Sequence, residues 1–409
     1  MDRISEVIAQ IPALDAAAMQ GARDRLDRLT KPQGSLGRLE ELAAKLAGIT
    51  GNARPRFPRK AVIVLAADHG VAAEGVSAYP QTVTAQMVQN FLAGGAAINV
   101  LARRAGARVV VADVGVAADL PPHALLVSRK LGYGSHNIAT GPAMDRASAS
   151  AAVCVGMDIL ESELARGLDL VATGDMGIAN TTAATAVIAA LTRRPPAEVT
   201  GRGTGLDEAQ LAHKVDVIER ALALNDPDPS DPLDVLARVG GFEIAALVGV
   251  ILAAAAHRTP VVLDGLASGA AALLATEMAP PAHQYLIAAH RSIEPGHRVA
   301  LERLELAPLL NLDLRLGEGT GATLAMHLVD DAVAILHEMA TFDEAGVSTG
   351  VGGQGSGVRA ASDHAATPGP WPPPPDPHRA PDSQPPTAHR ALAPSPRPRS
   401  GPWPPAPGP

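Results

Sequence analysis

One unit recurs along this chain: a short apolar strand, a polar or glycine-containing turn, and then a helical stretch. Strands that are apolar on both faces and alternate with helices are typical of a parallel sheet covered on both sides. We therefore predict an α/β fold with a doubly wound, mainly parallel, Rossmann-like sheet. The predicted strands are residues 61–66, 108–112, 168–173, 260–263, 284–289 and 312–316.

The residues before the first strand are predicted to be helical. Ser35 is the expected N-cap of a helix whose apolar face is Leu36, Leu39, Leu42 and Leu46. We predict that residues 1–60 contribute to a small helical domain. Residues 61–348 would form the α/β catalytic domain, with its last helices able to join the small domain.

The last part of the chain has a different composition. Half of the 36 prolines and both tryptophans follow residue 360, without a helical or strand period. Such a segment buries too little apolar surface to offset its ordering entropy. We therefore expect residues 349–409 to be a disordered proline-rich tail.

Charge and cysteine content limit the class of protein. A formal net charge of −8 argues against nucleic acid and anionic membranes as partners. The single cysteine, Cys154, and an N-terminus without a secretory pattern suit a cytoplasmic protein. The richest apolar run, residues 244–256, starts beside Glu243 and is too short to span a membrane, so we expect a buried helix.

The segment after residue 316 is the strongest candidate for a site. Gly317, Glu318 and Gly319 lead into an apolar helical run. A helix N-terminus after a glycine-rich turn gathers backbone N–H groups, and ligands of open α/β sheets bind at the carboxyl ends of the strands. On local pattern alone, however, a glutamate between glycines is more often an ordinary loop residue.

Residues 174–182 form a second candidate. They follow a predicted strand, precede a helix and include Asp175, Gly177, Asn180 and Thr181. Small residues, an amide and hydroxyls at a helix start suit a phosphate site. Ordinary N-capping by Asn180 or Thr181 explains the pattern equally well.

Residues 201–207 are also rich in glycine, including Gly203 and Gly205. They match neither a Walker A loop nor a dinucleotide fingerprint, but they can present N–H groups to an anion. Lys214, about two turns into the next helix, would add a positive charge. The alternative, a lysine on a solvated helix face, is the commoner case.

Two further stretches carry polar side chains. In residues 292–297 a Pro-Gly turn is able to aim Glu294 or His297 inwards. Asp68 and His69 either bind a metal or cap a turn. Because no histidine spacing fits a zinc site, we expect no essential metal.

Taken together, these stretches resemble the nicotinate-nucleotide:dimethylbenzimidazole phosphoribosyltransferases, which make α-ribazole phosphate for the lower ligand of cobalamin. The ordered set is specific, although each motif alone is weak. It comprises residues 29–40, 67–71, 75–80, 174–182, 201–207, 263–265, 292–297 and 314–322.

The resemblance implies a large doubly wound domain, a small helical domain, a homodimer, and no metal or organic cofactor. It implies that Glu318, between Gly317 and Gly319, is the general base and that Asp175 lies beside the phosphate and ribose of the mononucleotide. The positive charge that develops at C1′ in this reaction would favour a nearby carboxylate, and Asp175 is the candidate for this second catalytic role. The phosphate and ribose of the mononucleotide would be surrounded by Gly177, Asn180, Thr181, Gly203, Gly205 and Lys214. Ser77, Tyr79 and Gln86 would line the benzimidazole pocket.

Two positions depart from the family pattern. Many members have glutamate where this chain has Asp175, and glycine where it has Ala179. The shorter acid reaches less far, and the extra methyl group crowds the loop. Both changes would affect affinity, but neither removes the proposed base.

The activity that the resemblance implies is transfer of 5-phosphoribose from nicotinate mononucleotide to 5,6-dimethylbenzimidazole, with inversion at C1′. One alternative is a dehydrogenase or other nucleotide-dependent enzyme, against which the missing dinucleotide fingerprint counts. Another is a non-catalytic binder of azoles or nucleotides. Glu318 and Lys214 count against that alternative.

Overall fold

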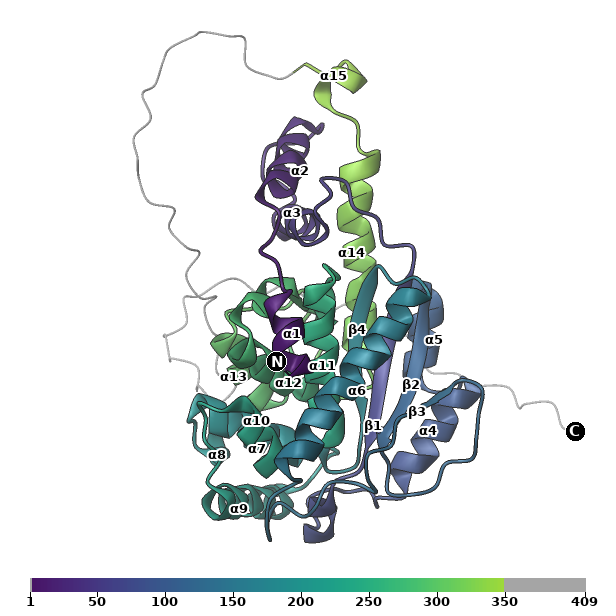
Figure 1. Cartoon of the computed structure of the whole chain (residues 1–409). Coiled ribbons are helices and arrows are strands. Elements are labelled where there is room, and N and C mark those ends of the chain that lie inside the picture. Colours follow the sequence, from purple (N-terminus) through teal and green to yellow (C-terminus); the bar gives the residue numbers. More distant parts are fainter. Residues whose placement is uncertain (1, 349–409) are drawn as a thin grey trace, which may run out of the picture. The chain divides into compact units, whose positions relative to one another are not determined.

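The computed structural model describes residues 2–348, in which six parallel strands form one sheet in the order β3-β2-β1-β4-β5-β6 (Figure 1). The predicted doubly wound α/β fold is therefore confirmed. The strands are β1 (Lys60–Ala67), β2 (Ala107–Gly115), β3 (Leu126–Ser128), β4 (Leu170–Met176), β5 (Val261–Leu263) and β6 (Leu286–Ala288).

Helices connect the strands and precede and follow the sheet. The α-helices are α1 (Arg3–Ala9), α2 (Ala16–Arg28), α3 (Arg38–Thr50), α4 (Val83–Ala93), α5 (Ala97–Ala105), α6 (Arg146–Ala165), α7 (Asn180–Thr192), α8 (Pro196–Val199), α9 (Glu208–Asn225), α10 (Pro232–Val239), α11 (Phe242–Ala256), α12 (Leu266–Met278), α13 (Pro295–Arg303), α14 (Thr320–Glu338) and α15 (Phe342–Ala345). Two short 3₁₀ helices are η1 (Gly70–Glu74) and η2 (Pro280–Tyr285).

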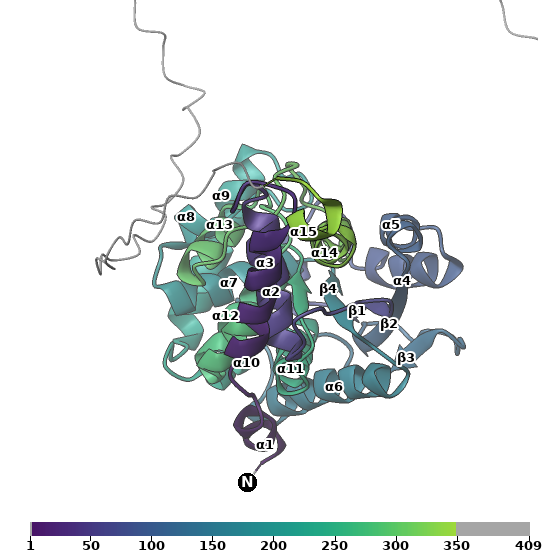
Figure 2. The same cartoon turned by 90° about the horizontal axis from the view of Figure 1, so that it is seen from above.

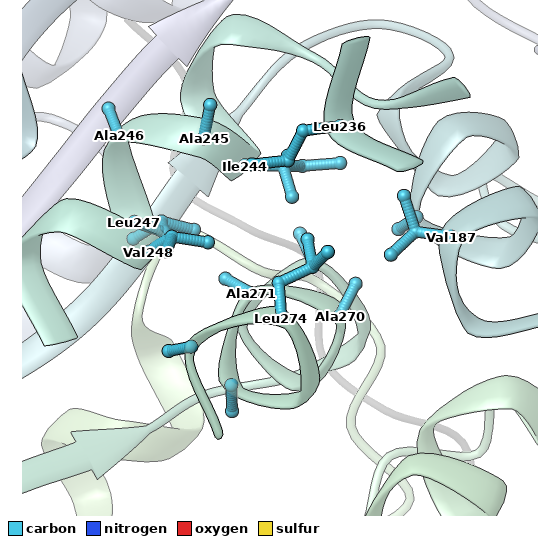
Figure 3. Close-up of a cluster of buried hydrophobic side chains, with 14 of the residues drawn as sticks. Val187, Leu236, Ile244, Ala245, Ala246, Leu247, Val248, Ala270, Ala271 and Leu274 are labelled. Atoms are coloured by element: carbon cyan, nitrogen blue, oxygen red, sulfur yellow. The ribbon is translucent and has the colours of Figure 1, made fainter. Parts of the chain in front are cut away.

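Each face of the sheet has its own apolar core, because side chains alternate along a strand. On β1, Ile63 and Leu65 belong to the core formed with α6, α7, α11 and α12. Val62 and Val64 belong to the core formed with α4, α5 and α14. Figure 3 shows part of the first core, where apolar side chains of α7, α10, α11 and α12 point toward one another.

The buried helix predicted at residues 244–256 is α11, which packs against α6 with almost no space between the two backbones. A Cβ added to Gly249 would lie 1.9 Å from the carbonyl oxygen of Val153, and one added to Gly156 would lie 1.8 Å from that of Ala246. Only glycine allows this approach. Within residues 2–348, no helix has the length and apolar content needed to cross a membrane.

The helices α2 and α3 lie beside the C-terminal half of α14 (Figure 1 and Figure 2). Leu29 and Thr341 form a backbone bridge, and the guanidinium of Arg25 donates to the carbonyl of Leu336 at 2.7 Å. The short helix α1 lies instead against α6 and α11. The domain boundary at residue 60 stays a prediction, and the predicted disordered tail lies outside the described residues.

One predicted strand is wrong. Residues 312–316 form an irregular segment in which Leu312 and Leu316 are 53% and 58% exposed, and Asp313 has a left-handed φ of 54°. The alternation of apolar residues here does not reflect a half-buried strand. The sixth strand is β3, a three-residue edge strand that is only partly buried and so lacks the continuous apolar run that marks the equally short β5 and β6.

Two smaller expectations also need correction. Ser35 lies in a turn and does not cap α3, which begins after Gly37 without a side-chain cap. The strand predicted at 284–289 is only β6, because η2 occupies the residues that precede it. Here a 3₁₀ turn takes up residues whose composition suggested a longer strand.

Candidate active site

The site lies where the strand order reverses, at the carboxyl ends of β1 and β4. The segment after β4 crosses directly over the end of β1, since a Cβ added to Gly177 would lie 2.1 Å from the carbonyl oxygen of Ala67. Crevices at this point of a doubly wound sheet are the usual ligand sites. The topology therefore places Asp175 and the predicted 174–182 segment at the expected edge.

Glu318 also lies at this edge, although no strand precedes it. Its φ of 63° is left-handed, between Gly317 at 82° and Gly319 at 86°. Its backbone N–H donates to the carbonyl of Asp175 at 3.3 Å. The turn thus requires two flanking glycines, and it attaches Glu318 to the end of β4 through the main chain.

The carboxylate of Glu318 is suited to accept a proton. The residue is 5% exposed, and its Oε2 has no hydrogen-bond partner among the described residues. Burial raises the pKa of Glu318, the Asp264 carboxylate raises it further, and a hydrogen bond from the backbone N–H of Ile98 lowers it. A buried carboxylate with a free oxygen and increased proton affinity has the properties of a general base.

Asp175 is the second carboxylate of the site. Its Oδ2 accepts a hydrogen bond from the side-chain amide of Asn180 at 2.7 Å. Burial, followed by the neighbouring Asp264, raises the pKa of Asp175 to about 7. Asn180 therefore orients a carboxylate and does not cap α7, whose N-cap is Ala179.

Asp264 supports the turn that carries Glu318 and had no role in the sequence interpretation beyond its place in a matching motif. Its two oxygens accept the backbone N–H groups of Gly319 at 3.1 Å and Ala322 at 3.0 Å. It thereby caps α14 and fixes the turn that carries Glu318. The available signal was an acid directly after the apolar residues of β5.

Lys214 lies on the opposite side of the site and is completely buried. Its Nζ donates to Thr181 Oγ1 at 2.7 Å, and a Cβ added to Gly203 would lie 3.2 Å from the same Nζ. Burial lowers the pKa of Lys214 to about 8, which leaves it mostly protonated at pH 7. The alternative of a solvated lysine is wrong, and the structure brings Lys214, Thr181 and Gly203 together.

Two side chains hold the backbone of Gly203. Its N–H donates to Glu294 Oε1 at 3.0 Å, and its carbonyl accepts from the Arg315 guanidinium at 2.8 Å. Glu294 and His297 both point inwards and are buried, as predicted. His297 Nδ1 accepts the N–H of Ser292 at 3.1 Å, and burial lowers the pKa of His297 to about 3, so this ring is neutral.

The residues predicted to line the benzimidazole pocket are less closely grouped. Ser77 lies in the loop between η1 and α4, where its Oγ is 3.4 Å from Thr204 Oγ1. Tyr79, in the same loop, is 55% exposed. Gln86 is an exposed residue of α4, and Gly205 an exposed residue of the 201–205 loop. The roles of Ser77, Tyr79 and Gln86 stay predictions.

A buried ion pair lies beneath the site and was missed by the sequence interpretation. His69 Nε2 is 2.7 Å from Glu243 Oε1, and both residues are buried. Burial lowers the pKa of His69, but the Glu243 carboxylate more than reverses this, so the pKa ends above its usual value. The signal was Glu243 itself, the acid that opens an otherwise apolar helix.

Asp68 is hydrogen-bonded to two other parts of the chain. It accepts hydrogen bonds from the Thr84 hydroxyl at 2.6 Å and the Ala117 N–H at 2.8 Å, and so joins α4 to the end of the sheet. Within the part of the chain that the structure describes, no three His, Cys, Asp or Glu side chains cluster as metal ligands would.

Ala179 is strained, because it is a buried alanine with a φ of 71°. Left-handed backbone costs about 1–2 kcal/mol in a residue with a Cβ. We expect Ala179→Gly to raise the free energy of unfolding by up to about 1 kcal/mol after the greater flexibility of unfolded glycine is subtracted. Urea unfolding measures the change.

The control for this prediction is Ala183→Gly, at a regular position of the same helix. It should lower the free energy of unfolding by about 0.5–1 kcal/mol. If both substitutions destabilised the protein equally, Ala179 would not be strained.

A buried cation beside a glycine-rich loop, together with acceptor carboxylates at the carboxyl end of the sheet, suits an enzyme that handles an anionic sugar substrate. In agreement, a family model described as phosphoribosyltransferase matches residues 11–347. The fold and the site thus define the class of protein.

Individual relatives narrow this class. Proteins described as nicotinate-nucleotide–dimethylbenzimidazole phosphoribosyltransferase from Chloroflexus aggregans and Desulforudis audaxviator are each 62% identical over 348 residues, which is 85% of this chain and 99% of theirs. The crystal structure of CobT from Thermus thermophilus is 53% identical, with a TM-score of 0.79, and the match covers 82% of this chain and 100% of that one. The chain belongs to the nicotinate-nucleotide–dimethylbenzimidazole phosphoribosyltransferase family.

Proposed function

We propose that the protein transfers the 5-phosphoribosyl group of nicotinate mononucleotide to 5,6-dimethylbenzimidazole, giving α-ribazole 5′-phosphate and nicotinate for the nucleotide loop of cobalamin. The observation that carries this proposal is the buried Glu318 carboxylate, with a free oxygen, beside Asp175 at the reversal point of the sheet. Family membership supplies the identity of the two substrates.

The mononucleotide would lie between Lys214 and Asp175. Its phosphate meets the buried ammonium of Lys214 beside the 201–205 loop, because a buried cation attracts an anion. Its ribose lies toward Asp175. Support for this placement comes from a continuous path of contacts: Lys214 to Thr181, the adjacent Asn180 to Asp175, and Asp175 to Glu318.

The reaction breaks the bond between C1′ and the pyridinium nitrogen of nicotinate, and the electron pair of that bond stays on the nitrogen. The leaving group therefore needs no proton. An unprotonated ring nitrogen of dimethylbenzimidazole forms the new bond to C1′. Attack from the face opposite the leaving group inverts C1′ and converts the β-linkage to an α-linkage.

The two carboxylates have separate tasks in this scheme. The second ring nitrogen of the azole becomes acidic as the new bond forms, and Glu318 Oε2 accepts its proton. Ionised Asp175 stabilises the positive charge that develops at C1′. Positioning of the two substrates supplies much of the remaining rate increase.

Product analysis tests this proposal. The purified full-length protein is incubated with nicotinate mononucleotide and dimethylbenzimidazole, and the products are separated and examined by mass spectrometry and NMR. Release of nicotinate with an α-linked ribazole phosphate is the expected result. Binding of both ligands without product would contradict the proposal and indicate a non-catalytic binder.

Replacement of Lys214 tests the position of the phosphate. We expect Lys214→Met, which keeps the length of the side chain but removes its charge, to weaken mononucleotide binding about 10- to 100-fold, since a hydrogen bond to a charged group contributes about 1.5–3 kcal/mol. The affinity for dimethylbenzimidazole alone should change little. Calorimetric titration of each ligand measures both effects.

Lys45→Met is the matched control. Lys45 is another largely buried lysine whose pKa burial lowers to about 8, but its Nζ donates to the carbonyl of Leu286, outside the site. An equal loss of mononucleotide affinity in both variants, or a loss confined to azole binding in Lys214→Met, would contradict the assignment.

We also infer that the enzyme is a cytoplasmic homodimer without nucleic-acid or membrane partners. Ile293, Leu312 and Leu316 are exposed on adjacent segments, joined by a hydrogen bond from the Ile293 N–H to the Leu314 carbonyl at 3.3 Å, and suit a subunit interface. Light scattering should give twice the chain mass, and a monomeric mass would contradict the inference. Cell fractionation tests the location.

A further inference from the structure

The 201–205 loop is in contact with three other parts of the site. Glu294 and Arg315 hold Gly203, and Arg315 is only three residues before Glu318. Lys214 and Thr181 lie against the same glycine. The loop expected to receive the phosphate is therefore connected to the segment that carries the base.

Thr204 connects this loop to the segment expected to receive the azole. Its Oγ1 accepts the backbone N–H of Ala78 at 2.9 Å and lies 3.4 Å from Ser77 Oγ. Ser77 Oγ in turn accepts the N–H of Tyr79 at 3.3 Å. One hydroxyl thus holds the turn formed by residues 77–79.

The azole segment has few other attachments. Ala78, Tyr79 and Pro80 are all exposed, so little apolar burial fixes them. A loop with few buried contacts and exposed backbone orders and disorders easily. Its hydrogen bonds to Thr204 therefore make a large contribution to the conformation in which Ser77 and Tyr79 meet a ligand.

We propose that Thr204 is a positioning residue that couples the two substrate sites, so that a sugar phosphate bound at the 201–205 loop tightens the binding of the azole. The inference rests on the proposed function, because it places the phosphate at this loop and the azole at residues 77–79. A ligand that orders the first loop removes part of the entropy cost of ordering the second. By thermodynamic linkage, the azole tightens the sugar phosphate by the same factor.

The test measures the dissociation constant of dimethylbenzimidazole by fluorescence titration of the full-length protein, with and without saturating ribose 5-phosphate. This probe carries the sugar and the phosphate but lacks nicotinate, so no transfer occurs. In the unsubstituted protein we expect ribose 5-phosphate to tighten azole binding about fivefold or more, the lower end of typical coupling. In Thr204→Val, which removes only the hydroxyl, the ratio should fall to about 1.

Two further variants distinguish a loss of coupling between the two ligands from a general disruption of the loop. Thr204→Ser keeps the hydroxyl and should keep the ratio. Thr200→Val is the matched control, because the Thr200 hydroxyl donates to the carbonyl of Pro196, the first residue of α8, and its ratio should equal that of the unsubstituted protein. The affinity for ribose 5-phosphate alone should change less than about twofold in all variants. A variant in which the 201–205 loop is unfolded would instead lose much of this affinity.

Either of two results would overturn the inference: a ratio of 1 in the unsubstituted protein, or an unchanged ratio in Thr204→Val. Failure of the proposed function is a separate result. It is seen as the absence of ribazole phosphate in the product analysis, whatever the coupling ratio.

Discussion

Replacement of Glu318 by glutamine is expected to reduce turnover about 10²- to 10⁴-fold, the usual contribution of a general base. Glutamine has the same shape but does not accept the azole proton, so the loss should fall on kcat. Binding should persist, because the turn is held by backbone hydrogen bonds to Asp175 and Asp264. Steady-state kinetics together with ligand titration measure both effects.

Glu305→Gln is a matched control for this prediction. Glu305 also has a left-handed φ, of 52°, but it is an exposed residue just after α13 and belongs to neither the 292–297 nor the 314–322 segment. Its replacement should leave turnover unchanged. Normal turnover in Glu318→Gln would remove Glu318 as the base, and a parallel loss of binding and turnover would indicate a structural role.

His69→Ala is expected to lower the free energy of unfolding by about 3–5 kcal/mol, because it leaves the Glu243 carboxylate buried without its partner. Urea unfolding at pH 7 measures the loss. His327→Ala, at an exposed position of α14, is the control and should change stability by less than about 0.5 kcal/mol.

A double-mutant cycle with Glu243→Ala separates the pair from the cavity that each substitution creates. The double variant should be less destabilised than the sum of the two single variants. Strict additivity would show that the two residues do not interact. Since the pKa of His69 is raised in the folded protein, the contribution of its proton is complete below the unfolded pKa of about 6.5 and is lost as pH rises through the folded pKa.

Much of the fold followed from the sequence, because both faces of the sheet are buried and the long strands are continuously apolar. The strands β1, β2 and β4 were predicted on that basis. The edge strand β3 was missed because it is only partly buried, whereas the equally short β5 and β6 are buried and apolar. Residues 312–316 were predicted to be a strand but do not form one. Leu312 and Leu316 project outward from an irregular segment. An alternating pattern of residue types does not reveal whether another part of the protein covers the apolar side.

The candidate site was predictable where its residues belong to local sequence motifs and was not where it depends on long-range pairing. Asp175, Glu318 and the two glycine-rich segments stand out locally. The contacts of His69 with Glu243 and of Gly203 with Glu294 join residues far apart in the chain. Such pairs are fixed only by the three-dimensional packing of the helices on the sheet.

The cap that Asp264 places on α14 also bears on how ring preference can change. Glu318 is anchored through its own backbone N–H to β4, and through the N–H groups of Gly319 and Ala322 to Asp264, the residue after β5. The loop that carries Ser77 and Tyr79 is outside this frame and exposed. On the proposed placement of the azole at residues 77–79, substitutions in that loop are expected to alter which azole is accepted while Glu318 keeps its position.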